Sequence, residues 1–332
     1  MNDLQRLHQF LSTPRKIVIT THHKPDGDAL GSSLGLFHYL NKKAGHVVNV
    51  ISPTDYPDFL HWLPGNSEVL NFELSRNRCL KLVEEADIFF CLDFNKLYRI
   101  NELGEHIGKS TAPKVLIDHH LEKDDFAEFE FWKTSACSTA ELVYQFIVDS
   151  NDEKLIDESI ATCIYTGILT DTNAFRVPTT SPFIHRVAAQ LMECGVDHTS
   201  VYNRIYETFS ESRLRLLGFT ITERMTIHPE YRCGIMTLDE ADLKRFNIKT
   251  GDTEGLVNFP LKIENVDMAA LIIQRPDQVK LSFRSKGNWD VNELAKQHFE
   301  GGGHKNAAGG KSTLNVNETK DKLISILAAL KK

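Results

Sequence analysis

The first half of the chain alternates short apolar runs with longer segments of helical periodicity. Four of these runs are rich in Val, Ile, Leu and Phe, as are strands that a sheet buries on both faces; they span residues 16–21, 46–52, 86–93 and 113–118. A fifth run, at 129–134, is predicted to be an edge strand. Helical patterns fill the gaps between the runs, so the sequence predicts a parallel α/β sheet.

From residue 138 to residue 224 the pattern is mainly helical. An apolar stripe at helical spacing within residues 160–169 leads directly to Asp171. The stretch 198–224 is charged and poor in glycine. We therefore predict that this stretch is a helical connection between two domains.

The last third of the chain has the pattern of an independent α+β domain. Its strand-like runs span residues 233–238, 267–274 and 279–285. A helix over 291–299, a glycine-rich loop and a closing helix complete the pattern. The predicted limits are 1–197 for the first domain, 198–224 for the connection and 225–332 for the smaller second domain.

Charge and cysteine usage limit the partners and the compartment. The formal net charge is −7 and no basic stripe is visible, so we expect a nucleic acid ligand to be short. No apolar run reaches the ~20 residues that span a bilayer, and residues 1–16 lack the apolar core of a signal peptide. The six cysteines are scattered, which predicts buried free thiols in a cytoplasmic protein that does not contact membranes.

Acidic and imidazole side chains follow three of the four apolar runs. In an open α/β sheet, ligands bind outside the carboxyl ends of the strands, so these side chains are expected to converge in one crevice. Asp171, at the end of the helical stripe, is expected to reach the same place. The candidate residues are His22, Asp26, Asp28, Asp93, Asp118, His119, His120 and Asp171.

Carboxylates that crowd together in a protein interior repel one another strongly unless a positive charge lies between them. Four of the candidate carboxylates carry the charge that neutralises two divalent cations. Two imidazoles would add nitrogen ligands, which favour Mn²⁺ over the oxygen-preferring Mg²⁺. The predicted metal ligands are His22, Asp26, Asp28, Asp93, His119 and Asp171.

At these residues the sequence resembles the DHH phosphoesterase family, named after the motif that stands here as Asp118-His119-His120. The segment THHKPDGD at 21–28 fits the first motif of that family. Asp93 fits the second motif, and GILTDTNAF at 167–175 fits the fourth. The second half of the chain is similar to the associated substrate domain, through SFRS and GGGHKNAAGG. The resemblance thus covers nearly the whole chain, with its motifs in family order.

The resemblance implies a role for each candidate in a two-metal centre. By position, His22 and Asp26 are implied to bind the first metal. The second metal is implied to be bound by Asp28, His119 and Asp171, and Asp93 is implied to bridge the two. Asp118 is implied to orient a ligand imidazole. His120 is implied to contact the scissile phosphate or to protonate the leaving oxygen.

The second domain is implied to hold the substrate. Arg284 and His304 would bind its phosphate or sugar, while Gly302 and Gly303 would let backbone N–H groups approach the anion closely. The implied first domain is the metal-binding catalytic domain, with a cleft between it and the substrate domain that suits short oligonucleotides.

Among members of the family, the sequence is most similar to the nano-RNases, some of which also remove phosphate from 3′-phosphoadenosine 5′-phosphate. The resemblance implies an exonuclease-like hydrolase that cleaves short RNA or DNA oligomers and dinucleotides such as pApA. A water that bridges two metals would attack phosphorus in line. The resemblance also implies a homodimer through the first domain.

Two other functions fit the same residues. One is a cyclic-dinucleotide phosphodiesterase on the same scaffold, which a panel of cyclic and linear dinucleotides would separate from a nano-RNase. The other is a metal-bound nucleotide sensor without turnover, which phosphate release with Mn²⁺ would exclude. A RecJ-type exonuclease acting on long strands fits less well, because this length leaves no room for further nucleic-acid-binding domains.

Overall fold

A computed structural model describes residues 3–43, 45–249 and 251–330. The chain forms two compact units that divide between Thr208 and Phe209. Each unit has its own sheet and its own hydrophobic core. The fold class is therefore α/β in the first unit, with a smaller α+β second unit, as the sequence predicted.

The described residues of the first unit form a six-stranded sheet in which all neighbouring strands are parallel. In sheet order, its strands are β3 (Val69–Asn71), β2 (Val47–Ser52), β1 (Lys16–Thr21), β4 (Ile88–Leu92), β5 (Lys114–Asp118) and β6 (Phe129–Trp132). The five predicted strands are confirmed, and β6 lies at an edge as expected. The sequence analysis missed β3, a three-residue strand at the other edge.

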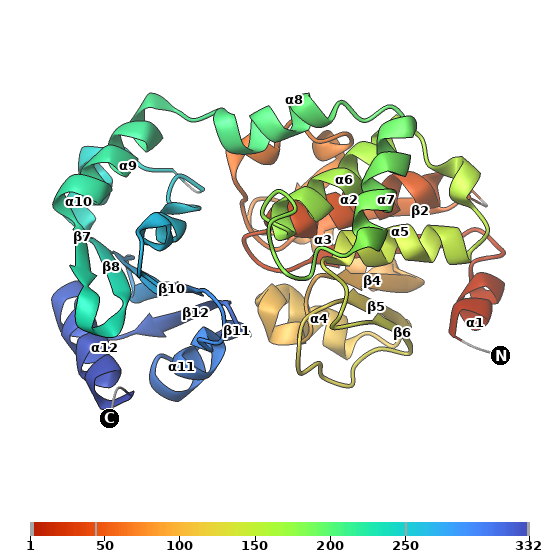
Figure 1. Ribbon diagram of the computed structural model, residues 1–332. Coiled ribbons are helices and arrows are strands. Elements are labelled where there is room, and N and C mark those ends of the chain that lie inside the picture. The colour runs from red at the N-terminus through yellow and green to blue at the C-terminus, as the bar shows by residue number, and fades with distance from the viewer. Residues whose placement is uncertain (1–2, 44, 250, 331–332) are drawn as a thin grey trace. The chain divides into compact units, whose positions relative to one another are not determined.

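Helices cover both faces of this sheet (Figure 1). Alternate residues of β1 belong to different cores: Ile17 and Ile19 lie in one hydrophobic cluster, and Val18 lies in the other. One face packs on α2 (Gly27–Asn41) and α5 (Thr139–Asp149), and the opposite face packs on α3 (Arg76–Glu85) and α4 (Glu102–Lys109). The remaining helices are α1 (Asp3–Phe10), α6 (Glu158–Asp171), α7 (Pro182–Glu193) and α8 (His198–Tyr202). Burial on both faces explains why the strand runs are apolar throughout.

Helices α2 and α6 approach each other through small residues. A Cβ atom at Gly31 would lie 2.5 Å from the Cys163 carbonyl oxygen, and one at Gly27 would lie 2.4 Å from the Cγ2 atom of Thr170. Gly31 therefore lets the backbones of α2 and α6 approach each other closely.

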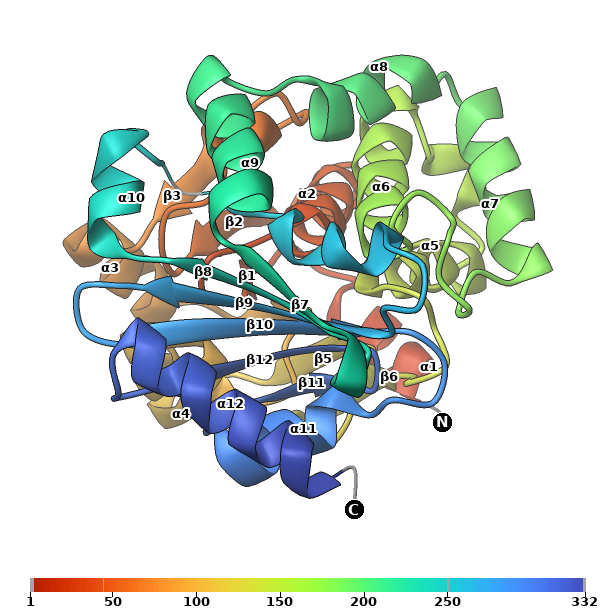
Figure 2. The ribbon, with the colours of Figure 1, turned by 60° about the vertical axis from the view of Figure 1, so that its left-hand side comes forward.

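The second unit is built on a mixed sheet. In order, the strands found among its described residues are β11 (Gly302–His304), β12 (Ala307–Ser312), β10 (Val279–Ser285), β9 (Met268–Gln274), β8 (Cys233–Leu238) and β7 (Met225–His228). Strands β8 and β9 are parallel, and the other neighbours are antiparallel. Figure 2 shows α11 (Val291–His298) and α12 (Val316–Leu330) beside this sheet. The three predicted strands and both predicted helices are confirmed.

The glycine-rich segment after α11 is a β-hairpin and not a loop. Strands β11 and β12 pair from Gly302 with Gly309 to His304 with Ala307. A Cβ atom at Gly301 would lie 2.0 Å from the Gly309 carbonyl oxygen. The glycines therefore serve a close backbone approach inside a sheet, a context that strand propensity alone does not reveal.

The predicted connecting helix over 198–224 is also two separate pieces. Helix α8 continues into a π-helical turn, Asn203–Glu207, whereas α9 (Glu211–Glu223) packs on the sheet of the second unit, with α10 (Glu240–Arg245) following β8. Residues 208–210 between the pieces are not helical. The division of the chain falls inside the predicted connection, while the limits at 197 and 225 stay predictions.

Two smaller expectations concern cysteines and membranes. All six cysteines are free thiols, and five of them are buried, with Cys194 partly exposed. Across the described residues, no helix combines the length and the apolar character needed to cross a bilayer.

Candidate metal centre

The candidate residues gather at the carboxyl edge of the parallel sheet. The strand order reverses between β1 and β4, which is the position where open α/β sheets bind ligands. His22 directly follows β1, and Asp93 directly follows β4. Asp118 is the last residue of β5, and Asp171 is the last residue of α6. The convergence expected from the sequence is therefore present in the structure.

His22 and Asp26 lie on the loop that joins β1 to α2. Asp26 caps α2, because its carboxylate accepts hydrogen bonds from the N–H groups of Asp28 and Ala29. The Nδ1 atom of His22 lies 2.9 Å from the carbonyl oxygen of His23, so Nδ1 carries the proton. Its Nε2 atom faces two carboxylates, 3.4 Å from Asp93 Oδ2 and 3.9 Å from Asp26 Oδ1. A neutral His22 thus presents a lone pair to a space bounded by carboxylate oxygens.

His119 is arranged in the same way on the other side of Asp93. Its Nδ1 atom lies 3.3 Å from the Ala136 carbonyl oxygen, which again assigns the proton to Nδ1. Its Nε2 atom lies 3.3 Å from Asp171 Oδ2, 3.6 Å from Asp93 Oδ1 and 3.9 Å from Asp28 Oδ2. Two imidazoles of matching orientation therefore flank one aspartate.

Asp93 lies between the two histidines, with one carboxylate oxygen toward each. Its side chain is almost fully buried, and its backbone has a φ of 63°. A non-glycine residue in this left-handed region is uncommon and is held there by its surroundings. Here the Asp93 N–H donates to the Ile117 carbonyl oxygen on β5. The strand end thus turns the carboxylate into the centre of the cluster.

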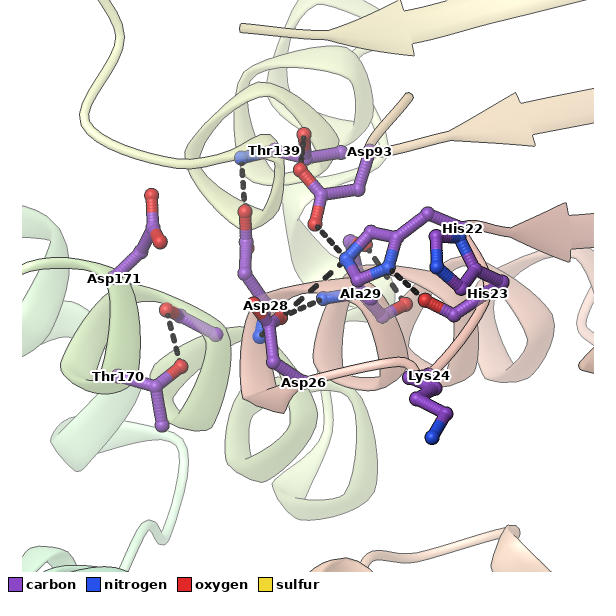
Figure 3. A network of polar contacts seen from close by, with 12 residues as sticks. His22, His23, Lys24, Asp26, Asp28, Ala29, Asp93, Thr139, Thr170 and Asp171 are labelled. Carbon is purple, nitrogen blue, oxygen red and sulfur yellow. Dashed lines mark hydrogen bonds and ion pairs between the residues drawn. The ribbon is translucent and has the colours of Figure 1, made fainter. Parts of the chain in front are cut away.

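Asp28 is held by the first turn of α5. Its Oδ2 atom accepts a hydrogen bond of 2.7 Å from the Thr139 N–H, and its Oδ1 atom accepts one of 2.9 Å from the Ala140 N–H. These contacts use the N–H groups that a helix N-terminus leaves without intrahelical partners. Figure 3 shows the contact between Thr139 and Asp28, with Asp93 beside them. Asp28 is therefore fixed by backbone groups.

Thr139 is a site residue that the sequence analysis missed. Its hydroxyl donates a 2.9 Å hydrogen bond to Asp93 Oδ1, while its N–H serves Asp28. One signal was available: Ser138-Thr139-Ala140-Glu141 has the Ser-x-x-Glu pattern of a helix N-terminus. Ser138 does cap α5, by accepting from the Glu141 N–H.

Burial and mutual repulsion disturb the ionisation of the carboxylates. Burial, followed by the charges of Asp93 and Asp171, raises the pKa of Asp28 well above its ordinary value. Burial likewise raises the pKa of Asp171 to about 7, against the lowering effect of His119. Asp93 behaves differently: burial would raise its pKa, but the hydrogen bond from His22 and the charges of the histidines outweigh it and lower the pKa. The central Asp93 therefore favours its ionised form, whereas Asp28 and Asp171 are shifted toward their protonated forms.

The two histidines shift toward the charged form. Burial would lower the pKa of His22, but the hydrogen bond with Asp93 and the charges of Asp26 and Asp93 raise it. Burial would also lower the pKa of His119, but Asp171 and Asp93 raise it. Protons on these rings compensate the crowded carboxylates when no cation does so.

The donor set fits a pair of divalent cations. Ligand atoms of His22, Asp26 and Asp93 lie within 4.8 Å of one another, as do those of Asp28, His119 and Asp171. Asp93 contacts both groups through its two oxygens. Four carboxylates meet there with two imidazoles, and two divalent ions would supply the balancing positive charge.

Asp118 and His120 form a hydrogen-bonded pair that adjoins the cluster, with His120 Nδ1 3.7 Å from Asp93 Oδ1. His120 Nδ1–H donates a 2.7 Å hydrogen bond to Asp118 Oδ1, and Asp118 is fully buried. Asp118 Oδ2 is buried and has no hydrogen-bond partner in the part of the chain that the structure describes. The Trp132 indole N–H donates to the His120 carbonyl oxygen, which fixes the main chain at that residue. Because the Nδ1 atom of His120 bonds to Asp118, its Nε2 atom points away from that carboxylate.

The four residues predicted to bind substrate lie on two strands of the second unit that both pair with β12. Arg284 is on β10, and Gly302, Gly303 and His304 form β11. The Arg284 guanidinium donates to the Phe283 carbonyl oxygen. The Gly303 N–H donates to Asn292 Oδ1 at 2.8 Å, so this N–H is not available to an anion, contrary to our expectation.

Comparison with known proteins shows the same two parts. Residues 16–168 match the DHH family, N-terminal domain, and residues 235–332 match the DHHA1 domain. The bifunctional oligoribonuclease and PAP phosphatase NrnA of Thermus thermophilus is 31% identical, over 88% of this chain and 83% of its own. A probable NrnA of Streptococcus mutans is 28% identical over 91% of each chain. The crystal structure of an exopolyphosphatase-related protein from Bacteroides fragilis is 37% identical and superimposes with a TM-score of 0.94, over 99% of this chain and 96% of that chain.

These similarities extend over both units and include the strand ends that carry the acidic and imidazole side chains. The chain belongs to the DHH family of phosphoesterases and carries a DHHA1 domain.

Proposed function

We propose that this protein hydrolyses phosphoester bonds in short oligoribonucleotides down to dinucleotides, and also removes phosphate from 3′-phosphoadenosine 5′-phosphate. The observation that carries the proposal is the central Asp93, whose two oxygens face two equivalent groups of imidazole and carboxylate ligands. The names of the NrnA relatives from Thermus thermophilus and Streptococcus mutans support the choice of substrate. The net charge of −7 supports short ligands over long strands.

In this proposal two divalent ions, with Mn²⁺ the predicted species, occupy the cluster. One is held by His22, Asp26 and Asp93, and the other by Asp28, His119, Asp171 and Asp93. When bound, such a pair polarises phosphoryl oxygens and acidifies water near neutral pH. The hydrogen bonds from Thr139 and from the α5 backbone keep the carboxylates aimed at the ions.

The Asp118–His120 pair has the geometry of a proton donor. Because Asp118 holds Nδ1–H of His120, the second ring nitrogen faces away from Asp118. We propose that His120 contacts the scissile phosphate or gives a proton to the leaving oxygen. Asp118 stabilises the charged ring and fixes its orientation, as a buried carboxylate does for a catalytic histidine.

The second unit is proposed to bind the substrate through Arg284, His304 and the backbone near Gly302. Arginine suits this role because its guanidinium pairs with two phosphate oxygens. The domain limits at 197 and 225, a homodimer through the first unit and a cytoplasmic location stay predictions. The free cysteines support a reducing compartment.

One incubation series tests the function. The protein with Mn²⁺ is mixed with labelled RNA oligomers of two to about twenty nucleotides. This range runs from a dinucleotide to a strand long enough to occupy more than one single-strand-binding fold. Parallel reactions contain 3′-phosphoadenosine 5′-phosphate and cyclic and linear dinucleotides. Cleavage of the short oligomers together with phosphate release supports the proposal. Preferred cleavage of the cyclic dinucleotide would replace the proposed substrate class, and no turnover at all would make the protein a nucleotide sensor.

A further inference from the structure

The segment after β4 carries an arginine that none of the roles above uses. Arg99 lies in a 3₁₀ turn, Leu97–Ile100, six residues after Asp93. Phe94 and Ile100 flank this segment, and neither exposes any surface. The turn is therefore anchored in the core at both ends, on the chain that leaves the metal centre.

The main chain at Arg99 is fixed to the neighbour of a predicted metal ligand. The N–H of His23 and its Nδ1–H both donate to the Arg99 carbonyl oxygen, at 2.9 Å and 3.0 Å. On the other side, a Cβ atom at Gly104 would lie 2.1 Å from the Leu97 carbonyl oxygen, so α4 packs directly on the turn. These contacts use the backbone of Arg99 and leave its side chain without a structural task.

The Arg99 side chain is half-buried and carries a permanent charge. Within the described ranges of the chain, its guanidinium makes no hydrogen bond and no ion pair. Arg99 nevertheless adjoins the metal centre, because its carbonyl oxygen accepts both hydrogen bonds from His23, the residue next to His22. A guanidinium is suited to bind an anion when it is partly desolvated, has no protein partner and lies beside the metal centre.

The charge balance of the metal centre points to a role for Arg99 in anion binding. The four carboxylates of the centre neutralise two divalent ions, so the loaded centre has no net charge toward a phosphate. We propose that Arg99 binds a non-bridging oxygen of the substrate phosphate on the His22 side of the metal centre. This inference rests on the proposed function and deepens it, since it places part of the substrate-binding charge in the first unit.

The test compares Arg99→Gln with Arg78→Gln, a control that removes an exposed cation from α3. Binding of adenosine 5′-monophosphate to the Mn²⁺-loaded protein is measured by calorimetry. Loss of one charged hydrogen bond is expected to raise the Kd about tenfold or more for Arg99→Gln, and to leave it unchanged for the control. For a dinucleotide substrate, KM should rise by a similar factor while kcat changes less than about threefold.

Two further measurements separate binding from structure. Arg99→Lys keeps the charge and should recover part of the affinity, and the number of Mn²⁺ ions bound should stay the same in all variants. An unchanged Kd in Arg99→Gln, or a loss of Mn²⁺ from that variant, would overturn the inference. So would a wild-type protein that does not bind the nucleotide.

Failure of the inference can be distinguished from failure of the proposed function. If the wild-type protein binds the nucleotide through Arg99 but cleaves no oligomer, the proposed function fails and the binding site stands. If it cleaves short oligomers and Arg99→Gln behaves like the control, only the inference fails.

Discussion

The Thr139 hydroxyl donates a 2.9 Å hydrogen bond to Asp93 Oδ1, the oxygen that also faces His119 at 3.6 Å. Thr139 is fully buried, so the bond is shielded from water. It restricts the rotation of the carboxylate that is proposed to serve two ions at once. The relationship makes Thr139 a positioning residue for the metal centre.

The first prediction follows from this bond. Thr139→Val keeps the shape of the side chain but removes the hydroxyl, and is expected to weaken Mn²⁺ binding about 10- to 100-fold, as the loss of a hydrogen bond to a metal ligand typically does. Thr139→Ser keeps the hydroxyl and should bind Mn²⁺ almost normally. Titration calorimetry measures both. Equal Mn²⁺ affinity in the valine and serine variants would show that the bond has no positioning role.

The second prediction concerns the bridging role of Asp93. Asp93→Ala removes an oxygen from both groups of ligands, so this variant is expected to lose both Mn²⁺ ions and all measurable turnover. His22→Ala affects only one group and should retain one ion. The bound metal is counted after gel filtration by atomic emission. A variant Asp93→Ala with a near-normal rate in Mn²⁺ would refute the bridging role.

The sequence was sufficient for much of the sheet and for the meeting of the candidate residues. Strands 16–21 and 86–93 are apolar because they are buried on both faces, and this pattern can be recognised in the sequence without knowledge of the fold. His22 and Asp93 stand at the ends of these runs, so parallel pairing alone brings them together. The site could thus be predicted wherever a strand end carries the side chain.

The sequence was insufficient where a contact depends on packing between distant elements. Thr139 reaches Asp93 because α5 begins beside β4, which no periodicity predicts. The β11–β12 hairpin looks like a loop because its glycines pack against other backbone and not through side chains. Gly31 packs on the Cys163 carbonyl oxygen of α6, a helix that is distant in the sequence. In each case the deciding contact is tertiary.

The third prediction concerns pH and metal removal. A carboxyl group whose pKa is higher in the folded than in the unfolded protein destabilises the folded state increasingly as the pH rises from the unfolded toward the folded pKa. A histidine with a raised pKa stabilises the folded state at low pH, and this stabilisation is lost as the pH rises through the folded pKa. Asp28, Asp171, His22 and His119 all have raised values, with Asp171 at about 7. The lowered pKa of Asp93 matters only in acid. Metal-free protein should therefore lose stability between about pH 5 and about pH 8.

The measurement is a thermal melt in chelator across this pH range. A fall in Tm on the order of 5 °C is expected, because several groups shift in the same direction. Saturating Mn²⁺ should remove the fall, since it neutralises the carboxylates in their ionised form. Asp171→Asn should make the metal-free curve flatter. A Tm that rises with pH in the metal-free protein would contradict the assigned shifts.

The last prediction compares two glycines inside helices. Gly31 in α2 faces the α6 backbone, where an added Cβ would lie 2.5 Å from the Cys163 carbonyl oxygen, whereas Gly218 in α9 has nothing within 4 Å of that position. The two sites share the same intrinsic preference of helices for alanine, about 0.5–1 kcal/mol. Gly218→Ala should therefore stabilise the protein by about that amount. Gly31→Ala should lower the free energy of unfolding by about 1–3 kcal/mol, because backbone on both helices must separate. Urea denaturation of both variants at saturating Mn²⁺ measures the difference, and a stabilising Gly31→Ala would show that the helices have room to spare.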